Sequence, residues 1–386
     1  MSEIVFILGA GTSAEAGAPL IKGFLRKAEE LRTDNRVGRF KDDFDLLDRA
    51  VGELQLLLPK TYVNLDDIET VFGLFEMGKL LGGFLAKSEE DIDKLLVSIR
   101  NVILATLEQT LVFRGVDGNI RPMPYHETFA RLVHALHVER KRKCSILTFN
   151  YDLALDFALH NMAVIPIDYC LSEKIERGRV PFMKLHGSLN WGACSKCGTV
   201  IPWHLSEFFA KVGVNTNSQK LFLHVGSMLS QSGLTHCESA IDNTPVIVPP
   251  TWNKTAYSRP LGQVWRHAAR ELSDAEYVFV SGYSLNPIDS FFRHLLALGL
   301  CGTGRLRQFQ VFDIDAQVAG RFKELVGTGV SEFNPSQMQF SAAIPLIGHA
   351  LRLPNEVLDE LNKGLVAQQG IRSQTETADR RVFFGG

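Results

Sequence analysis

Six short apolar runs along the chain predict buried strands. They are rich in valine, isoleucine, leucine and phenylalanine, a composition typical of strands covered on both faces, as in a parallel sheet. Helical patterns separate most of these runs, so we expect an α/β fold with a Rossmann-like parallel sheet. The runs are Ile4–Leu8, Cys144–Thr148, Phe182–Leu185, Val246–Val248, Tyr277–Val280 and Gln310–Phe312.

The long stretch between the first two runs has the spacing of amphipathic helices. Asn64 followed by Asp67 resembles a helix start, with a side-chain cap and early acidic residues. We therefore predict a helical insertion, which could be a lid over a pocket, an oligomer contact, or simply a set of packing helices. The expected helices are Phe44–Leu58, Asp66–Leu81 and Asp91–Leu111.

The same pattern divides the chain into a core and two insertions. From Gln368 onward the chain is polar and without periodicity, which is typical of a disordered end. Its apolar stretch Val382–Phe384 could instead dock on a neighbouring subunit. The predicted ranges are 1–39, 126–190 and 245–345 for the Rossmann-like core, 40–125 for the helical insertion, 191–244 for a small cysteine-containing module, and 346–386 for a C-terminal helix and tail.

Composition excludes several classes of protein. The chain of 386 residues is 45% hydrophobic and 22% charged, as in ordinary globular proteins. A net charge of −2 disfavours a dominant nucleic-acid surface, and the short basic run at 140–143 is typical of a solvated helix end. No apolar run is long enough to cross a bilayer, and the start lacks the basic region of a secretion signal. Six cysteines do not make a disulfide scaffold, so we expect a cytoplasmic protein.

The first chemical signal is the sequence GAGTSAEAGAP at Gly9–Pro19, directly after the first predicted strand. A strand that breaks into a glycine-rich turn and then a helix can cradle a dinucleotide pyrophosphate on free N–H groups at the helix start. The spacing is G-x-G-x5-G rather than G-x-G-x-x-G, and such glycines often only close a tight turn. The motif therefore favours a nucleotide site without establishing one.

Four further polar segments stand where predicted strands end. In open α/β sheets ligands bind outside the carboxyl ends of the strands, so these segments could form one pocket. Each residue also has a purely structural interpretation: Asn150 as a turn former, His186 as a satisfied core imidazole, and Asp313 or Asp315 as a helix cap. The segments are Thr148–Asp152, Lys184–Trp191, Ser281–Pro287 and Phe312–Asp315.

Taken in order, these motifs resemble the sirtuin family, and most closely a bacterial sirtuin-like branch that carries KLHGSLNW and a V-P-P-T segment. The resemblance covers the Rossmann-like core and leaves out the helical insertion and the tail. It implies that NAD is bound as a substrate. Asn150 and Asp152 would face the nicotinamide ribose, and His186 would be the catalytic base. The implied contacts to the rest of NAD are Gly9, Ala10, Gly11 and Ser13 at the pyrophosphate and ribose, Gly282 and Ser284 at the phosphates or adenine ribose, and Asp313 at the adenosine ribose hydroxyls.

The chain departs from the deacylating members of that family in two places. Deacylases follow the first proline with an acidic, aromatic and basic triplet, whereas here Pro19 leads into Leu20–Lys22. Deacylases also carry a segment that pairs with the acyl-lysine peptide as an added strand. The counterpart here, 245–252, contains two successive prolines that remove two backbone donors. These departures favour hydrolysis of NAD to nicotinamide and ADP-ribose. A deacylase, an ADP-ribosyltransferase and a non-catalytic NAD or ADP-ribose sensor remain the alternatives.

The small module contains a C-x-x-C-G sequence that often supplies half of a zinc site. Cys194 and Cys197 form it, and Cys237 is a candidate third ligand. Adjacent residues seldom both ligate one tetrahedral ion, so the fourth ligand could be His204, His224 or, less easily, His236. A structural zinc is one interpretation of this zinc-ribbon-like module, and a former zinc ribbon held by packing alone is the other.

The resemblance also implies a biological setting. Bacterial members of the branch are implied to act in antiphage defence by depleting NAD. Free NAD hydrolysis would kill the host, so the activity must be gated, and assembly is the simplest gate. We therefore expect a homo-oligomer, and a hetero-oligomer with a HerA-type ATPase as a further hypothesis. Neither a membrane nor direct nucleic-acid binding is expected.

Overall fold

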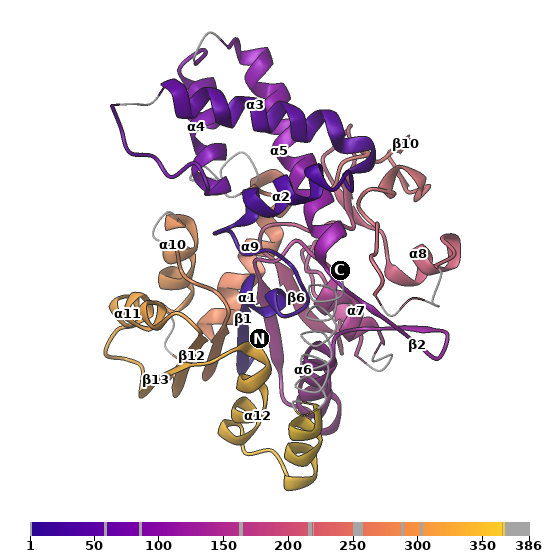
Figure 1. The fold of residues 1–386 in the computed structure, drawn as a ribbon. Helices are drawn as coiled ribbons and strands as arrows, with labels where there is room; N and C mark the ends of the chain where they lie inside the picture. The colour runs from indigo at the N-terminus through magenta and orange to yellow at the C-terminus, as the bar shows by residue number, and fades with distance from the viewer. Residues whose placement is uncertain are drawn as a thin grey trace, which may run out of the picture.

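A seven-stranded sheet forms the centre of the computed structural model, and every strand pairing within it is parallel. Figure 1 shows this sheet with helices around it. In spatial order the strands are β13 (Glu332–Gln337), β12 (Gln308–Asp313), β11 (Tyr277–Ser281), β1 (Ile4–Leu8), β4 (Cys144–Thr148), β6 (Val180–Lys184) and β5 (Ile167–Asp168). The structure describes residues 2–57, 60–84, 87–161, 165–214, 218, 220–249, 258–286, 289–301, 304–364 and 366.

The predicted α/β fold with a parallel sheet is confirmed. Five of the six apolar runs correspond to β1, β4, β6, β11 and β12. Every residue of β1, β4 and β6 is buried. Strands covered on both faces read as continuous apolar runs, which is why the sequence identified them.

The sixth predicted strand, Val246–Val248, is wrong. This segment lies outside the sheet, and Ile247 makes only an isolated antiparallel bridge to Gly187. Its backbone is hydrogen-bonded to the loop that follows β6 rather than to a strand of the sheet. A short apolar run reports burial, and here the burial comes from packing on a loop.

The two edge strands were not predicted. The sequence of β13, EFNPSQ, has a mostly exposed pattern and a proline, which is tolerated at an edge. At the other edge, β5 has only two residues. Edge strands carry little apolar signal, so the sequence does not reveal them.

The strand order reverses at β1. This strand pairs with β4 on one side and with β11 on the other, so later strands of the chain lie on both sides of it. In doubly wound folds such a switch point is where ligands bind, outside the carboxyl ends of the strands. The turn after β1 therefore lies at the position from which a site is expected.

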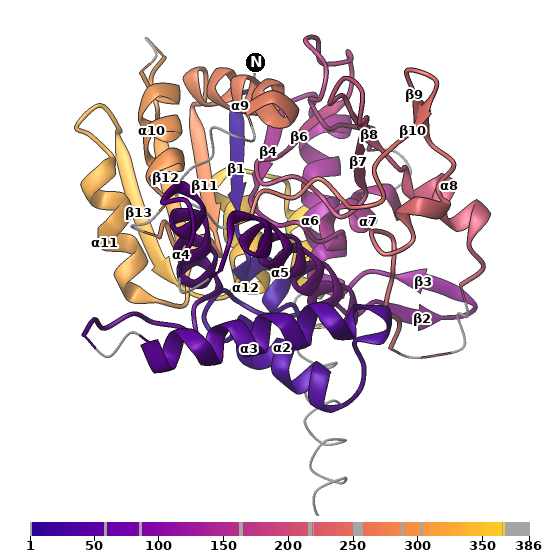
Figure 2. The same cartoon turned by 90° about the horizontal axis from the view of Figure 1, so that it is seen from above.

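Helices cover both faces of the sheet. Figure 2 shows α9 and α10 on one side and α6 with α12 on the other. The helices around the core are α1 (Gly11–Ala14), α2 (Phe24–Thr33), α6 (Pro124–His134), which continues as a π-helix over Ala135–Glu139, α7 (Ala154–Asn161), α9 (Ser258–Ser273), α10 (Ser290–Gly299), α11 (Ala316–Leu325) and α12 (Phe340–Ala350).

The three helices predicted between β1 and β4 are confirmed. They are α3 (Lys41–Leu57), α4 (Ile68–Leu80) and α5 (Glu89–Thr110), preceded by a 3-10 turn at Gly38–Phe40. Figure 1 shows them at one end of the molecule, beyond α1 and α2. Asp67 caps α4 as expected, because its carboxylate accepts the N–H of Glu69 at 2.8 Å. Ser88 and Asp91 form a capping box at the start of α5.

A β-hairpin follows α5 inside the range predicted to be helical. Its strands are β2 (Arg114–Val116) and β3 (Asn119–Arg121), which pair antiparallel. Asp117 and Gly118 form the turn with φ of 50° and 73°. Asp-Gly is a strong signal for such a turn, so the sequence did carry this information.

In its described residues, the cysteine-containing module has two small hairpins and one helix. Its elements are β7 (Trp191–Ala193), β8 (Val200–Pro202), α8 (Leu205–Lys211), a 3-10 turn at Leu229–Gln231, β9 (Thr235–His236) and β10 (Ser239–Ala240). Among the described residues, none of the helices is long and apolar enough to cross a membrane. The tail from Gln368 lies outside the described residues.

The turn after β1 packs directly against the turn after β11. The Gly9 N–H donates to the Ser281 carbonyl at 3.0 Å, and the Gly11 N–H donates to the Gly282 carbonyl at 2.9 Å. A Cβ on Gly11 would lie 2.6 Å from the Cα of Gly282, and Gly282 has a φ of +60°. Side chains do not fit at this contact, so the glycines hold two strand ends together.

Gly282→Ala is expected to lower the free energy of unfolding by about 2–4 kcal/mol, because the new Cβ meets the Gly11 backbone in a left-handed conformation. Gly320→Ala, on the exposed surface of α11 with open space around its Cα, is the control and should stabilise by up to about 1 kcal/mol. Urea unfolding of both variants measures the difference. Equal effects at the two positions would contradict the close approach described here.

Candidate functional site

Asn150, on the loop after β4, is hydrogen-bonded to the glycine-rich turn after β1. Its Nδ2 donates to Thr12 Oγ1 and to Ser13 Oγ, both at 3.1 Å. Thr12 Oγ1 in turn donates to the Gly9 carbonyl at 2.8 Å. The Oδ1 of Asn150 is buried and has no hydrogen-bond partner within the described part of the chain. A buried acceptor without a donor is costly, so this atom marks where a ligand hydroxyl or water would be stabilised.

Asp152 lies beside Asn150 and is buried. Its Oδ1 accepts the Ala154 N–H at 2.9 Å, and its carboxylate is also hydrogen-bonded to the Ser13 hydroxyl. Burial raises the pKa of Asp152 above its ordinary value, and the Lys184 ammonium is the largest opposing influence. Ser13 thus connects the amide of Asn150 to the carboxylate of Asp152, which brings together three residues predicted from the sequence.

His186 follows β6 and is half-buried between aromatic rings. The Phe149 ring meets its imidazole edge-on, with centroids 5.1 Å apart, and the Tyr151 ring lies roughly parallel at 5.9 Å. Its backbone carbonyl accepts the Val248 N–H at 2.7 Å. The imidazole is therefore oriented by packing from the same loop that carries Asn150.

The free N–H groups predicted at the first helix start are engaged within the protein. Besides the Gly11 N–H, the Thr12 N–H donates to the Gly9 carbonyl at 2.9 Å, and the Ser13 N–H to the Ala10 carbonyl at 3.0 Å. The bonds of Thr12 and Ser13 close local turns at the start of the four-residue helix α1, and that of Gly11 joins it to the turn after β11. The roles of Gly9, Ala10, Gly11 and Ser13 toward NAD stay predictions.

His126 is hydrogen-bonded to the glycine-rich turn after β1. Its Nε2 lies 3.0 Å from the Thr12 carbonyl, which can only accept, so Nε2 carries the proton. Burial lowers the pKa of His126 to about 3. The ring is therefore a neutral, structural donor rather than a second base.

The expected adenosine end of the site lies at β11 and β12. Ser284 is exposed, and its carbonyl accepts from Arg321 Nη1 at 2.6 Å. Asp313 Oδ1 accepts the Asp315 N–H at 2.9 Å, and burial together with the nearby Asp315 carboxylate raises the pKa of Asp313. Asp315 is the N-cap of α11, as its structural interpretation predicted. Gly282 joins this end to the turn after β1.

The helical insertion reaches the same edge of the sheet. Asn286 Nδ2 donates to Glu69 Oε2 at 2.5 Å, and Lys22 forms a backbone bridge with Asp67. Glu69 is in the first turn of α4. Nothing in the local sequence indicates that two residues 217 positions apart meet, so this contact could not be predicted.

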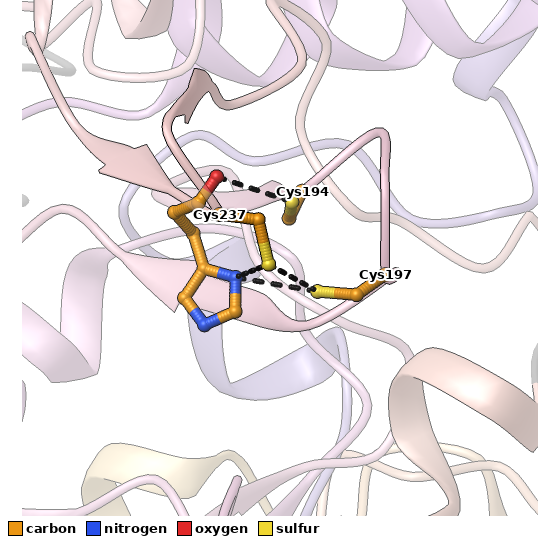
Figure 3. A group of neighbouring side chains, drawn as sticks. Cys194, Cys197 and Cys237 are labelled. Carbon is orange, nitrogen blue, oxygen red and sulfur yellow. Dashed lines mark hydrogen bonds between the residues drawn. The ribbon is translucent and has the colours of Figure 1, made fainter.

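Four residues of the small module form a cluster of metal-ligand atoms. Cys194, Cys197, His236 and Cys237 bring one ligand atom each to within 4.8 Å of one another. Figure 3 shows the labelled side chains of Cys194, Cys197 and Cys237 close together, with a dashed line between the sulfurs of Cys197 and Cys237. His236 Nδ1 lies 3.2 Å from both Cys197 Sγ and Cys237 Sγ, and these two sulfurs are 3.7 Å apart.

These distances fit a tetrahedral zinc ion. Zn–S bonds of about 2.3 Å place two sulfurs about 3.8 Å apart, close to the observed separation. Hydrogen bonds with Thr199 lower the pKa of the Cys197 thiol to about 6, toward the thiolate that zinc requires. The donor set of three thiols and one imidazole is a known structural zinc set, so the residues present could hold this ion.

The preferred order of fourth ligands is overturned. His236, ranked last, is in the cluster, whereas His224 pairs with Glu108 at 3.5 Å and His204 precedes α8. The β9–β10 hairpin turns at Cys237 and Glu238, with φ of 51° and 58°. This turn brings the side chains of two adjacent residues to one side, which extended or helical backbone would not do.

Comparisons with known proteins yield likenesses only among solved structures. No protein-family model and no curated protein matches this chain. A Sir2 homologue in complex with NAD is 16% identical and aligns over 94% of this chain and 90% of its own, with a TM-score of 0.38. Sir2 bound to an acetylated peptide is 13% identical, over 91% and 94%, with a TM-score of 0.38. Similarity at this level supports no conclusion about activity, and the family resemblance stays a prediction from sequence motifs.

Protein purified without chelators is expected to carry about one zinc ion per chain, because the four ligand atoms converge as zinc requires. His236→Ala and Cys197→Ser should each reduce the zinc content well below one. His224→Ala is the matched control and should keep its zinc. Elemental analysis of the four proteins provides the measurement, and zinc lost from His224→Ala but retained in His236→Ala would contradict the assignment.

Proposed function

We propose that this protein is a sirtuin-like NAD hydrolase that releases nicotinamide and ADP-ribose. The observation that carries the proposal is the group of Asn150, Ser13 and Asp152 at the switch point of the sheet. The buried Oδ1 of Asn150 has no donor among the described residues. An amide and a carboxylate joined by a hydroxyl suit a ribose and a water more than they suit a packed core. The sequence resemblance supports the same substrate.

The chemistry needs few groups. The bond between the ribose anomeric carbon and the nicotinamide nitrogen breaks, its electron pair leaves with nicotinamide, and the sugar gains oxocarbenium character. Asn150 Oδ1 would hold the attacking water or a ribose hydroxyl, and His186 would accept the proton that the water loses. The buried carboxylate of Asp152 would stabilise the positive charge that develops on the sugar.

The segment at 245–249 supports hydrolysis over deacylation. Val246 and Val248 turn their N–H and carbonyl groups toward the chain's own loops: Val246 to Ser188 and Trp191, Val248 to His186 and Tyr151. A peptide pairing on the opposite edge would face residues 245, 247 and 249. Two of these are prolines, so Ile247 offers the one N–H donor on that edge. Such an edge is a poor template for an acyl-lysine peptide.

The zinc ion belongs to this proposal as a structural element. Bound by Cys194, Cys197, His236 and Cys237, the ion would fix the β9–β10 hairpin against the turn between β7 and β8. It has no step in the reaction.

We further propose that the protein acts in the cytoplasm in antiphage defence, as a homo-oligomer gated by assembly with a HerA-type ATPase. The resemblance supports the setting. Exposed leucines on the insertion support assembly: Leu56 is 81% exposed, and Leu80 and Leu81 are each 70% exposed. The ion pairs Lys87–Glu53 and Lys79–Asp93 bring the end of α3, the end of α4 and the start of α5 together, so these leucines gather at one end.

His186→Ala is expected to lower nicotinamide release from NAD by roughly 10²–10⁴-fold, the usual loss for a general base. A comparable loss is expected for Asn150→Ala, because its Oδ1 would no longer hold the water. Chromatographic assay of nicotinamide and ADP-ribose, with no acylated peptide present, gives the rates.

Controls for these two variants are His349→Ala on the exposed face of α12 and Asn119→Ala in the β2–β3 hairpin, both of which should keep full activity. Wild-type activity in His186→Ala would refute the base assignment. Activity of the wild type on an acyl-lysine peptide, with no release of nicotinamide in its absence, would replace the proposal with a deacylase.

Light scattering of the purified protein should give a mass that is a multiple of the chain mass. Leu80→Asp combined with Leu81→Asp should lower it, because charged side chains oppose burial of this apolar end. The control is Leu298→Asp on α10. Leu298 is exposed but far in sequence from Leu80 and Leu81, so this substitution should leave the mass unchanged. A monomeric wild type that also fails to bind a HerA-type ATPase would refute the proposed assembly.

A further inference from the structure

Lys184 is a buried charge to which the proposed reaction assigns no step of its own. It is the last residue of β6, it is fully buried, and it precedes the loop that carries His186. Its Nζ donates to Asp156 Oδ2 at 2.7 Å and to the backbone carbonyl of Asp152 at 2.6 Å. Burying an ammonium costs several kcal/mol unless it is paired and hydrogen-bonded, and here both conditions are met.

The hydrogen bonds continue from Asp156 to the loop after β6. Tyr169 donates its hydroxyl to Asp156 Oδ1 at 2.7 Å, and Asn190 Nδ2 lies 3.4 Å from the same hydroxyl. Asn190 Oδ1 accepts the Ser188 hydroxyl at 2.7 Å. All of these side chains are buried. We call Lys184, Asp156, Tyr169, Asn190 and Ser188 the buried polar network.

This network connects the two loops that carry the proposed reacting groups. At one end, Lys184 fixes the carbonyl of Asp152, two residues after Asn150. At the other, Ser188 and Asn190 lie two and four residues after His186. The loops come from neighbouring strands β4 and β6, whose pairing ends at Thr148 and Lys184. Beyond these residues a backbone hydrogen bond, from the Leu189 N–H to the Tyr151 carbonyl at 3.0 Å, joins the two loops, and the buried polar network adds side-chain contacts to it.

A purely apolar contact could bury the same volume at lower cost, since replacing a buried ion pair by apolar residues is often neutral or stabilising. What apolar side chains cannot do is fix a carbonyl in one direction. Hydrogen bonds have directional geometry, and a fully satisfied buried network selects one arrangement of the backbone.

We propose that Lys184 is a positioning residue, which holds the Asn150–Asp152 loop in register with the His186 loop through the buried polar network. The inference rests on the proposed NAD hydrolysis for its kinetic consequence, although the coupling of the two loops is independent of it. Lys184 itself touches no reacting atom.

The test uses two variants of the full chain. Lys184→Met removes the charge and leaves Asp156 an unpaired buried carboxylate, so it should be strongly destabilised. Lys184→Met combined with Asp156→Asn removes both charges, keeps an acceptor for Tyr169, and should regain most of the lost thermal stability. In both variants kcat for NAD should fall by roughly 10–100-fold with KM changed less than about threefold, because misplacement of reacting groups by about 1 Å has an effect of that size.

A merely structural role predicts a different result. The double variant would then recover kcat together with stability, and that outcome would overturn the proposal, as would a raised KM with unchanged kcat. Met183→Ala, a buried neighbour on the same strand outside the network, is the control. It should lose stability and keep kcat.

Hydrogen exchange separates this inference from the proposed function. In the double variant, the backbone amides of residues 149–153 and those of residues 186–190 should both exchange faster than in the wild type. In Met183→Ala, the exchange rates of these two segments relative to the rest of β4 and β6 should be unchanged. If the wild type releases no nicotinamide from NAD, the proposed function fails, and the exchange data still decide whether Lys184 couples the loops. Unchanged exchange in both segments would refute the coupling.

Discussion

The contact between the turn after β1 and the turn after β11 is the constraint on which the site depends. Gly9 and Gly11 meet Gly282 with no room for a side chain, and their N–H groups bond to the carbonyls of Ser281 and Gly282. This contact sets the position of Thr12 and Ser13, which in turn hold the amide of Asn150. The glycines therefore pack backbone against backbone, and their contact with the NAD phosphates stays a prediction.

Several polar groups around the site are satisfied by the protein itself. His126 donates to the glycine-rich turn, Lys184 to the loop after β4, and Asn286 to Glu69 on the insertion. Asn150 Oδ1, by contrast, is buried and has no hydrogen-bond partner among the residues that the structure describes. A site in which the supporting groups are fixed and one acceptor is left for the ligand loses little conformational freedom on binding.

The sequence was sufficient for the strands at the centre of the sheet, because burial on both faces leaves a continuous apolar run in β1, β4 and β11. The sequence did not predict β13, because this mostly exposed edge strand has no apolar run. It wrongly predicted a strand at Val246–Val248, a segment that is bridged to the loop after β6.

For the site, the rule that ligands bind at the carboxyl ends of parallel strands predicted that Asn150 and Asp152 lie near the glycine-rich turn, and the structure places them there. The rule cannot give contacts between distant segments, such as that of Glu69 with Asn286. The wrong ranking of His236 has a local cause. The rule that adjacent residues seldom share a metal holds for extended and helical backbone, and the hairpin turn at Cys237 and Glu238 is neither. Similarly, a lysine at the end of a strand looks like a surface residue in sequence, and only the packed structure shows that Lys184 is buried.

The position of β1 has a consequence for how the chain is made. This strand is the first of the sheet to leave the ribosome, yet its partner in β11 is about 270 residues further along. At typical synthesis speeds of about 5–20 residues per second, one edge of an entirely apolar strand waits roughly 14–55 s for its partner. Pairings between such distant segments also slow folding after synthesis. During that interval we expect the nascent chain to expose a strand edge of the kind that aggregates.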